Sequence, residues 1–262
     1  MGSHDTGVDL GTPTTADNCS VASTTNDAPA VFPIGDTVVT WTVTDGSGRT
    51  ATATQTVTVV DNIDPTITAP VAVTVNVDAA SCEATGVDLG TPTTADNCSV
   101  ASTTNDAPAV FPIGDTIVTW TVTDASGNSA TATQTVTVVD NIDPTITAPA
   151  AVTVNVDAGT CATALANVTL GTPTTADNCS VASTTNDAPA TFPLGDTTVT
   201  WTVTDGSGNS ATATQTVTVV DNIDPTITAP AAVTVNVDAG TCATALANVT
   251  LGTPTTADNC SV

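Results

Sequence analysis

The feature that most constrains this chain is that it repeats itself. A segment Val-Thr-Trp-Thr-Val-Thr-Asp recurs around Trp41, Trp120 and Trp201, which lie 79 and 81 residues apart. A unit of about 80 residues is longer than most solenoid repeats and suits one small β-sandwich domain. Self-similarity on this scale predicts an array of domains. A second segment, Gly-Thr-Pro-Thr-Thr-Ala-Asp-Asn-Cys-Ser-Val, begins at Gly11, Gly90, Gly171 and Gly252.

The segment Asp-Asn-Ile-Asp-Pro sets the boundaries of the units, because it begins at Asp61, Asp140 and Asp221. It predicts two complete units, residues 62–140 and 141–221. Residues 5–61 form a unit that lacks its first strands, and residues 222–262 form the opening part of a further unit. Residues 1–4, Met-Gly-Ser-His, resemble an expression scar.

The composition indicates an all-β protein. Thr, Val and Ala dominate the chain, and β-branched side chains favour strands. Val118, Trp120 and Val122 alternate with threonines, and after a turn the same alternation returns up to Val138, which predicts a hairpin. Val71 to Val77 alternate in the same way. With shorter strands between Pro and Gly breaks, about seven strands per unit predict tandem immunoglobulin-like β-sandwich domains, arranged as an elongated rod.

The charge excludes several classes of partner and activity. The net charge is −25, and Arg49 is the one residue among Lys and Arg. No basic surface can neutralise phosphates, so nucleic acid is excluded, as are an anionic membrane surface and direct membrane insertion. The one His, His4, lies in the scar, and the chain has no Lys or Tyr. The Asp residues recur at turn positions in every unit, whereas catalytic acids rarely come as one copy per unit, so we expect no enzymatic activity.

The seven cysteines indicate disulfides and an oxidising, extracellular or cell-surface location. Cys19 has no partner within its unit, where Ser3 aligns with Cys82. A zinc site is disfavoured because no His or second Cys lies at ligand spacing. The spacing predicts three pairs within units: Cys82–Cys98, Cys161–Cys179 and Cys242–Cys260.

The acidic linkers are candidate calcium sites. In an immunoglobulin topology the first strand starts beside the loops that hold Asp96 and Asp124, and clustered oxygen ligands suit Ca²⁺. The alternative is that Asp-Pro and Asn are ordinary turn formers. The candidate ligands are Asp61, Asp64, Asp96, Asn97 and Asp124 at one linker, and Asp140, Asp143, Asp177, Asn178 and Asp205 at the next.

Several spaced landmarks resemble the hyalin repeat, or HYR domain. They are Phe111-Pro112-Ile113-Gly114, Asp124 with Gly127-Asn128, Val136-Thr137-Val138, and Asp96-Asn97. The resemblance implies an extracellular immunoglobulin-like module with adhesion and matrix roles and no catalytic activity. The family often carries two cysteines at positions that here look like Ala69 and Ala132, so that pair is missing.

Two functions follow as hypotheses. The first is an extracellular structural spacer, stalk or fibre, whose incomplete end units assemble head-to-tail with neighbouring copies of the chain into filaments. The second is an adhesin or binding module that recognises carbohydrate, ice or a partner protein, for which outward threonine rows such as Thr131, Thr133 and Thr135 are candidates. A solvated strand face with good β propensity is the preferred explanation of those rows.

Overall fold

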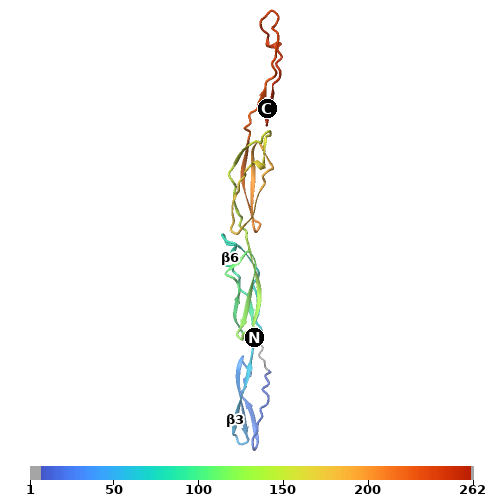
Figure 1. Cartoon of the computed structure of the whole chain (residues 1–262). Coiled ribbons are helices and arrows are strands. Elements are labelled where there is room, and N and C mark those ends of the chain that lie inside the picture. Colours follow the sequence, from blue (N-terminus) through green and yellow to red (C-terminus); the bar gives the residue numbers. More distant parts are fainter. Residues whose placement is uncertain (1–6, 261–262) are drawn as a thin grey trace. The chain divides into compact units, whose positions relative to one another are not determined.

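The computed structural model describes residues 7–260, so the predicted scar at residues 1–4 lies outside the described part. The described chain consists of β-strands and loops with two short 3-10 helices, which confirms the all-β prediction (Figure 1). It divides into two compact units. The first comprises Glu83–Val139 and the described part of Met1–Asp78, and the second comprises Ala79–Cys82 and the described part of Asp140–Val262.

The first unit begins with a three-stranded sheet, β1-β2-β3, followed by the eight strands of the second repeat. The second repeat has a four-stranded sheet, β5-β11-β10-β8, and two strand pairs, β4-β7 and β6-β9. The strands are β1 (Val21–Asn26), β2 (Gly35–Asp45), β3 (Thr50–Val59), β4 (Thr66–Thr68), β5 (Val73–Asn76), β6 (Glu83–Thr85), β7 (Thr93–Ala95), β8 (Val100–Asn105), β9 (Val110–Pro112), β10 (Gly114–Asp124) and β11 (Ser129–Val139).

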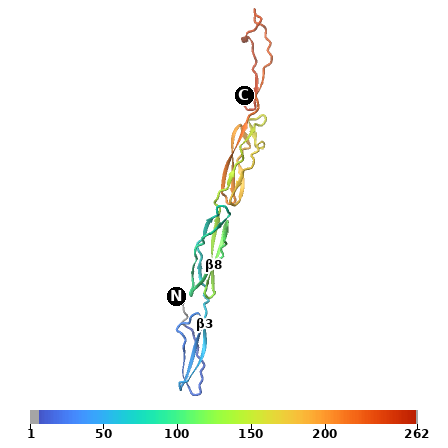
Figure 2. The ribbon, with the colours of Figure 1, turned by 90° about the vertical axis from the view of Figure 1, so that its left-hand side faces the viewer.

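The second unit repeats this arrangement with a sheet β13-β19-β18-β16 and pairs β12-β15, β14-β17 and β20-β21. Beyond residue 222 the described chain has the short pair β20-β21 and the 3-10 helix η2, and Figure 2 shows this segment, in red, largely as extended loops. The elements are β12 (Thr145–Thr147), β13 (Val152–Asn155), β14 (Ala162–Ala164), η1 (Leu165–Asn167), β15 (Thr174–Ala176), β16 (Val181–Asn186), β17 (Thr191–Pro193), β18 (Gly195–Asp205), β19 (Ser210–Val220), β20 (Thr226–Thr228), η2 (Leu246–Asn248) and β21 (Thr255–Ala257).

The long hairpin forms as predicted, with Gly114 opposite Val138 and Thr123 opposite Ser129. Two details differ from the prediction. Each complete repeat has eight strands where about seven were expected. The strands of the short pairs contain only three residues each, so the sequence pattern did not define their number. The alternating stretch from Val71 forms a strand only over Val73–Asn76, where it pairs in parallel with β11, and Val71 is left 84% exposed.

The core lies between the long hairpin and the short pairs. Val118, Val122 and Val136 are fully buried, and their neighbouring threonines face outward, as the two-residue period of a strand requires. Gln134 interrupts the apolar face of β11, yet it is buried and fully bonded. Its Oε1 accepts from Trp120 Nε1 at 3.0 Å, and its Nε2 donates to the carbonyls of Val71 at 2.8 Å and Leu89 at 3.0 Å. Gln134 thereby fastens the hairpin to two loops of its own repeat.

No helix among the described residues has the length and apolarity that crossing a membrane requires.

Candidate functional site at the joints between repeats

The acidic residues predicted as ligands gather at what we call the joints, the Asp-Asn-Ile-Asp-Pro segments and the loops that contact them. At the first joint, carboxylate oxygens of Asp61, Asp96 and Asp124 all lie within 4.8 Å of one another. Asp61 follows β3, Asp96 follows β7, and Asp124 ends β10. The structure thus brings three of the five residues predicted at this linker close together.

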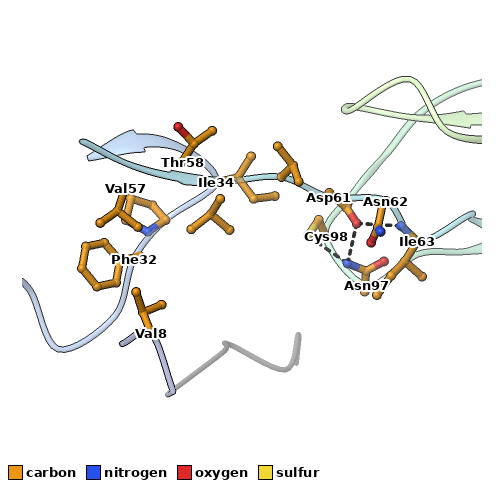
Figure 3. Close-up of a pocket in the computed structure, with 13 residues that line it drawn as sticks. Val8, Phe32, Ile34, Val57, Thr58, Asp61, Asn62, Ile63, Asn97 and Cys98 are labelled. Carbon is orange, nitrogen blue, oxygen red and sulfur yellow. Dashed lines mark hydrogen bonds between the residues drawn. The ribbon is translucent and has the colours of Figure 1, made fainter. Parts of the chain in front are cut away.

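Two amides hold the first joint in place. Asn97 Nδ2 donates to Asp61 Oδ1 at 3.2 Å and contacts Cys98 Sγ at 3.1 Å, as Figure 3 shows. Asn128 Nδ2 donates to the Asp61 carbonyl at 3.1 Å and to Asp124 Oδ2 at 2.8 Å. Asn128 therefore links the linker to the hairpin turn. The Ile63 N–H, followed by the Asn97 amide, holds the pKa of Asp61 below its usual value.

Some oxygens at this joint have no partner among the described residues. Asp61 Oδ2 and Asp96 Oδ1 are buried and accept no hydrogen bond. Burying a carboxylate oxygen unpaired is costly, and three carboxylates at this distance repel one another. A cation would relieve both effects.

The second joint repeats the arrangement with one change. Asp140 and Asp177 approach one another, and Asn178 Nδ2 lies 3.3 Å from Asp140 Oδ1. Asp177 Oδ1 and Asn178 Oδ1 are buried without a partner among the described residues. Asp205 is not part of this close group. Asn209 connects it indirectly, donating to Asp205 Oδ2 at 2.7 Å and to the Asp140 carbonyl at 3.2 Å.

The remaining predicted ligands lie apart from these groups. Asp64 and Asp143 are exposed and belong to neither close group of acidic side chains. Asn128 and Asn209 were missed as members of the joints. Their signal was present in the sequence, since each ends the turn that begins with the predicted Asp124 or Asp205.

The predicted disulfides within repeats are wrong. Cys82 is bonded to Cys179 of the next repeat, with 4.9 Å between the two Cα atoms, and not to Cys98. The reason is geometric. The loop Ala79–Cys82 belongs to the second unit, where Asn178 Nδ2 donates to the Ser81 carbonyl at 3.0 Å. That hydrogen bond places Cys82 beside Cys179, so Cys161 is not the partner of Cys179.

The third predicted pair fails in the same way. Cys242 and Cys260 are not bonded to each other. Cys260 lies instead beside Cys161, whose Sγ is 3.0 Å from the Asn259 carbonyl oxygen. A hydrogen bond with Cys161, together with burial and Asp221, raises the pKa of Cys260 to about 12.

The fold and these joints define a tandem β-sandwich protein whose clustered polar groups lie where repeats meet. Comparison with known proteins names the class. The model of the HYR domain matches residues 1–59, 60–138 and 139–219, and the chain belongs to this family.

Two relatives are hyalins of sea urchins. Hyalin of Lytechinus variegatus is 37% identical over 213 residues, which cover 76% of this chain and 40% of that protein. Hyalin of Strongylocentrotus purpuratus is 34% identical over 224 residues, which cover 81% of this chain and 19% of that protein. The chain thus spans less than half the length of either relative. It is an extracellular or cell-surface protein.

Among solved structures, a crystal structure of Drosophila N-cadherin EC1-4 is 12% identical with a TM-score of 0.34. That match covers 72% of this chain and 59% of the other, and it is too distant to bear on function.

Proposed function

We propose that the chain is a structural spacer, one stretch of a stalk or fibre, and that it carries out no catalysis. The observation that supports this most is that counterpart side chains make the same contacts in successive repeats. The tryptophan donates to the glutamine at 2.9, 3.0 and 3.0 Å in the first, second and third repeats. Asp27, Asp106 and Asp187 each accept a backbone N–H at 2.6 Å. These recurring contacts hold the fold of each repeat together, and a spacer needs no further reactive group.

A spacer is tested by its length. We expect that inserting one further copy of residues 141–221 after residue 221 raises the maximum dimension in small-angle X-ray scattering, and that a second copy adds the same increment. A maximum dimension that does not grow would contradict the spacer. The rival binding function predicts a signal on a glycan array or in ice-affinity partitioning. That signal would weaken when Thr131, Thr133 and Thr135 are changed to Val, because one of the repeated threonine rows is lost, whereas a spacer gives no signal with either protein.

We also propose that the joints bind Ca²⁺. The donors fit a hard cation, since Asp61, Asp96 and Asp124 offer only oxygen. At the second joint the sulfur of Cys179 is in a disulfide, which leaves the oxygens of Asp140, Asp177 and Asn178. A bound ion would supply positive charge between carboxylates, and the residues themselves would fix the linker to the loops of the next repeat.

The calcium proposal is tested by calorimetric titration with CaCl₂. We expect Asp61→Asn to lower the number of bound ions by one, and Asp115→Asn to leave it unchanged. Asp115 is a matched control because it lies away from the joint and accepts from Thr137 Oγ1 at 2.7 Å. Ca²⁺ at 100 times its Kd should stabilise the fold by about 2.7 kcal/mol if only the folded state binds it. Equal stoichiometry in both variants, or no heat at all, refutes the site.

The partner we propose is a second copy of the chain, bound head-to-tail. Phe32 is only half-buried, although its counterparts Phe111 and Phe192 are buried. Phe111 pairs with Ala84 of β6, and residues 7–61 contain no strand in that place. An apolar cavity of about 700 Å³ lies there instead, lined by Val8, Phe32, Ile34 and Val57 among others (Figure 3).

Residues 222–260 carry apolar side chains that suit this place. Ile227, Val233, Val235, Val237 and Leu246 are all exposed. Their counterparts in the third repeat, Ile146, Val152, Val154, Val156 and Leu165, pack in or against the core around Phe192. Residues 226–248 of one copy therefore have the side chains needed to cover Phe32 of another. Such a contact is heterologous and does not close, so it builds filaments.

Light scattering across protein concentration, in reducing buffer, tests the head-to-tail contact. We expect the mass to rise with concentration for the parent chain and for Thr234→Asp, but not for Val235→Asp. The two variants add the same charge to opposite faces of one extended segment. A parent chain that stays monomeric, or a Val235→Asp variant that still assembles, rules the contact out.

A further inference from the structure

The third joint reproduces the hydrogen bonds of the second joint, where the disulfide lies. Asn178 Nδ2 donates to the Ser81 carbonyl at 3.0 Å, and Asn259 Nδ2 donates to the Thr160 carbonyl at 2.9 Å. The same two amides lie 3.2 and 3.3 Å from Cys179 Sγ and Cys260 Sγ. They also lie 3.3 and 3.4 Å from Asp140 Oδ1 and Asp221 Oδ1. The two joints thus share one geometry.

The sulfur atoms follow the same correspondence. Cys82 Sγ is 3.6 Å from the Asn178 carbonyl oxygen, and Cys161 Sγ is 3.0 Å from that of Asn259. Cys179 Sγ is 3.9 Å from the Ser81 carbonyl, and Cys260 Sγ is 4.0 Å from that of Thr160. Cys260 also packs against the buried cluster of the third repeat. Cys161 and Cys260 therefore occupy the places that Cys82 and Cys179 hold in the bonded joint.

We propose that Cys161 and Cys260 form a disulfide, so that the second and third joints are each closed by one bond from the opening loop of a repeat to the Asn-Cys of the following repeat. The cysteines of this chain then link successive repeats along the array and do not form disulfides within single repeats.

The reaction is thiol–disulfide exchange with a small disulfide such as oxidised glutathione. One thiolate attacks the small disulfide, forms a mixed disulfide and releases one reduced thiol. The other protein thiolate then attacks the mixed disulfide, closes the Cys161–Cys260 bond and releases a second thiol. Two protein thiols are oxidised, and one small disulfide is reduced to two thiols.

Peptide mapping must distinguish two possible pairings of Cys260 that give similar cross-linked peptides. The segments around Cys161 and Cys242 are identical, so the parent chain alone does not distinguish Cys161–Cys260 from Cys242–Cys260. Single substitutions resolve them. The monomer fraction of each variant is incubated with oxidised glutathione, blocked with an alkylating agent and digested before Asp residues. This gives Cys260 a short peptide of its own, Asp-Asn-Cys-Ser-Val.

We expect Cys242→Ser to keep the short peptide cross-linked, now to the Cys161 peptide, and Cys161→Ser to leave it alkylated. The Cys82–Cys179 bond in the same digest serves as the positive control. A short peptide that is alkylated in Cys242→Ser, or cross-linked to Cys242 in Cys161→Ser, overturns the proposal. Neither result depends on whether the chain acts as a spacer, because the mapping reads the register alone.

Discussion

At the scale of single residues, the buried glutamine is the most informative side chain in each repeat. Gln215 is 2% exposed and satisfies three groups. It accepts from Trp201 Nε1 at 3.0 Å and donates to the carbonyls of Ala150 at 2.8 Å and Leu170 at 2.9 Å. In the first repeat, Gln55 keeps the tryptophan bond at 2.9 Å, but within residues 7–260 its amide donates to the Leu10 carbonyl alone, at 3.3 Å. The glutamine side chain thus links the hairpin to two loops through hydrogen bonds, and it makes all of these bonds in the complete repeats.

Replacing Gln215 by Leu should destabilise the third repeat by about 1–3 kcal/mol, because buried groups are left unpaired. Hydrogen exchange with mass spectrometry measures this repeat by repeat, since β10 and β18 differ at Ile117 and Thr198 and give peptides of different mass. We expect faster exchange in β18 and no change in β10. Thr214→Ala, on the exposed face of β19, is the control and should stay within about 0.5 kcal/mol of the parent. Unchanged exchange in β18 would show that the hydrogen bonds of Gln215 are dispensable for the stability of the third repeat.

Alternation in the sequence was enough to predict the long hairpins and their buried faces, because a two-residue period over ten residues has one reading. The three-residue strands were not predictable as pairs, since so short a run carries no period. The acidic groups at the joints followed from the topology that was assumed. The disulfide pairing could not be predicted in this way. The loop Ala79–Cys82 lies with the next repeat, and the spacing of cysteines within one repeat does not indicate this.

At the scale of elements, a short insertion explains why the spacing of the repeats changes from 79 to 81 residues. The loop from Cys161 to Gly171 is two residues longer than that from Cys82 to Gly90, and it contains the 3-10 helix η1. The helix brings Asn167 to Asp157, with 2.8 Å between Asn167 Nδ2 and Asp157 Oδ1. In the second repeat, Asp78 accepts from the N–H and hydroxyl of Thr85, at 3.1 and 2.8 Å.

Asp157 should make the third repeat sensitive to acid. The Ala164 N–H, then Thr163 and Asn167, hold the pKa of Asp157 below its usual value of 3.8. A carboxyl whose pKa is depressed in the folded state contributes stability that is present above the unfolded pKa and lost as the pH falls through the folded pKa. We therefore expect Asp157→Asn to melt at a lower temperature than the parent at pH 7.

The two melting temperatures should converge as the pH falls below 3.8, and calorimetry between pH 7 and pH 2 follows this. Asp196→Asn removes the same charge from an exposed carboxylate that accepts from Thr218 Oγ1 at 2.7 Å, and it serves as the control. A melting difference for Asp157→Asn that is constant across this range contradicts the assignment.

At the scale of the whole molecule, the pairing of cysteines between successive repeats predicts which cysteines a head-to-tail assembly would bond. If residues 226–248 of one copy complete the first repeat of another, Cys242 occupies the place that Cys82 holds in the second repeat. Cys82 bonds to the following repeat. The repeat that follows the completed one contains Cys98, which lies beside Asn97 and lines the cavity at the first joint (Figure 3).

Filaments should therefore be locked by a bond between Cys242 of one copy and Cys98 of the next. We expect oxidised glutathione at high protein concentration to produce a ladder of covalent oligomers on a non-reducing gel. Cys242→Ser and Cys98→Ser should each abolish that ladder, because each removes one sulfur of the bond. Light scattering in reducing buffer should still show both variants assembling, since the apolar contact around Phe32 is unchanged.

Cys19→Ser is the matched control, because Cys19 belongs to the duplicated segment that competes with residues 252–260 for one position. The sulfur that Cys19 would reach in another copy, Cys161, is already bonded to Cys260 of its own chain by the proposal above, and the Cys242–Cys98 bond does not need Cys19. Covalent oligomers should therefore persist in Cys19→Ser. Covalent oligomers that persist in Cys98→Ser and are lost in Cys19→Ser would mean that the copies are bonded through Cys19. The cysteine pairing seen at the second joint would then not apply between chains.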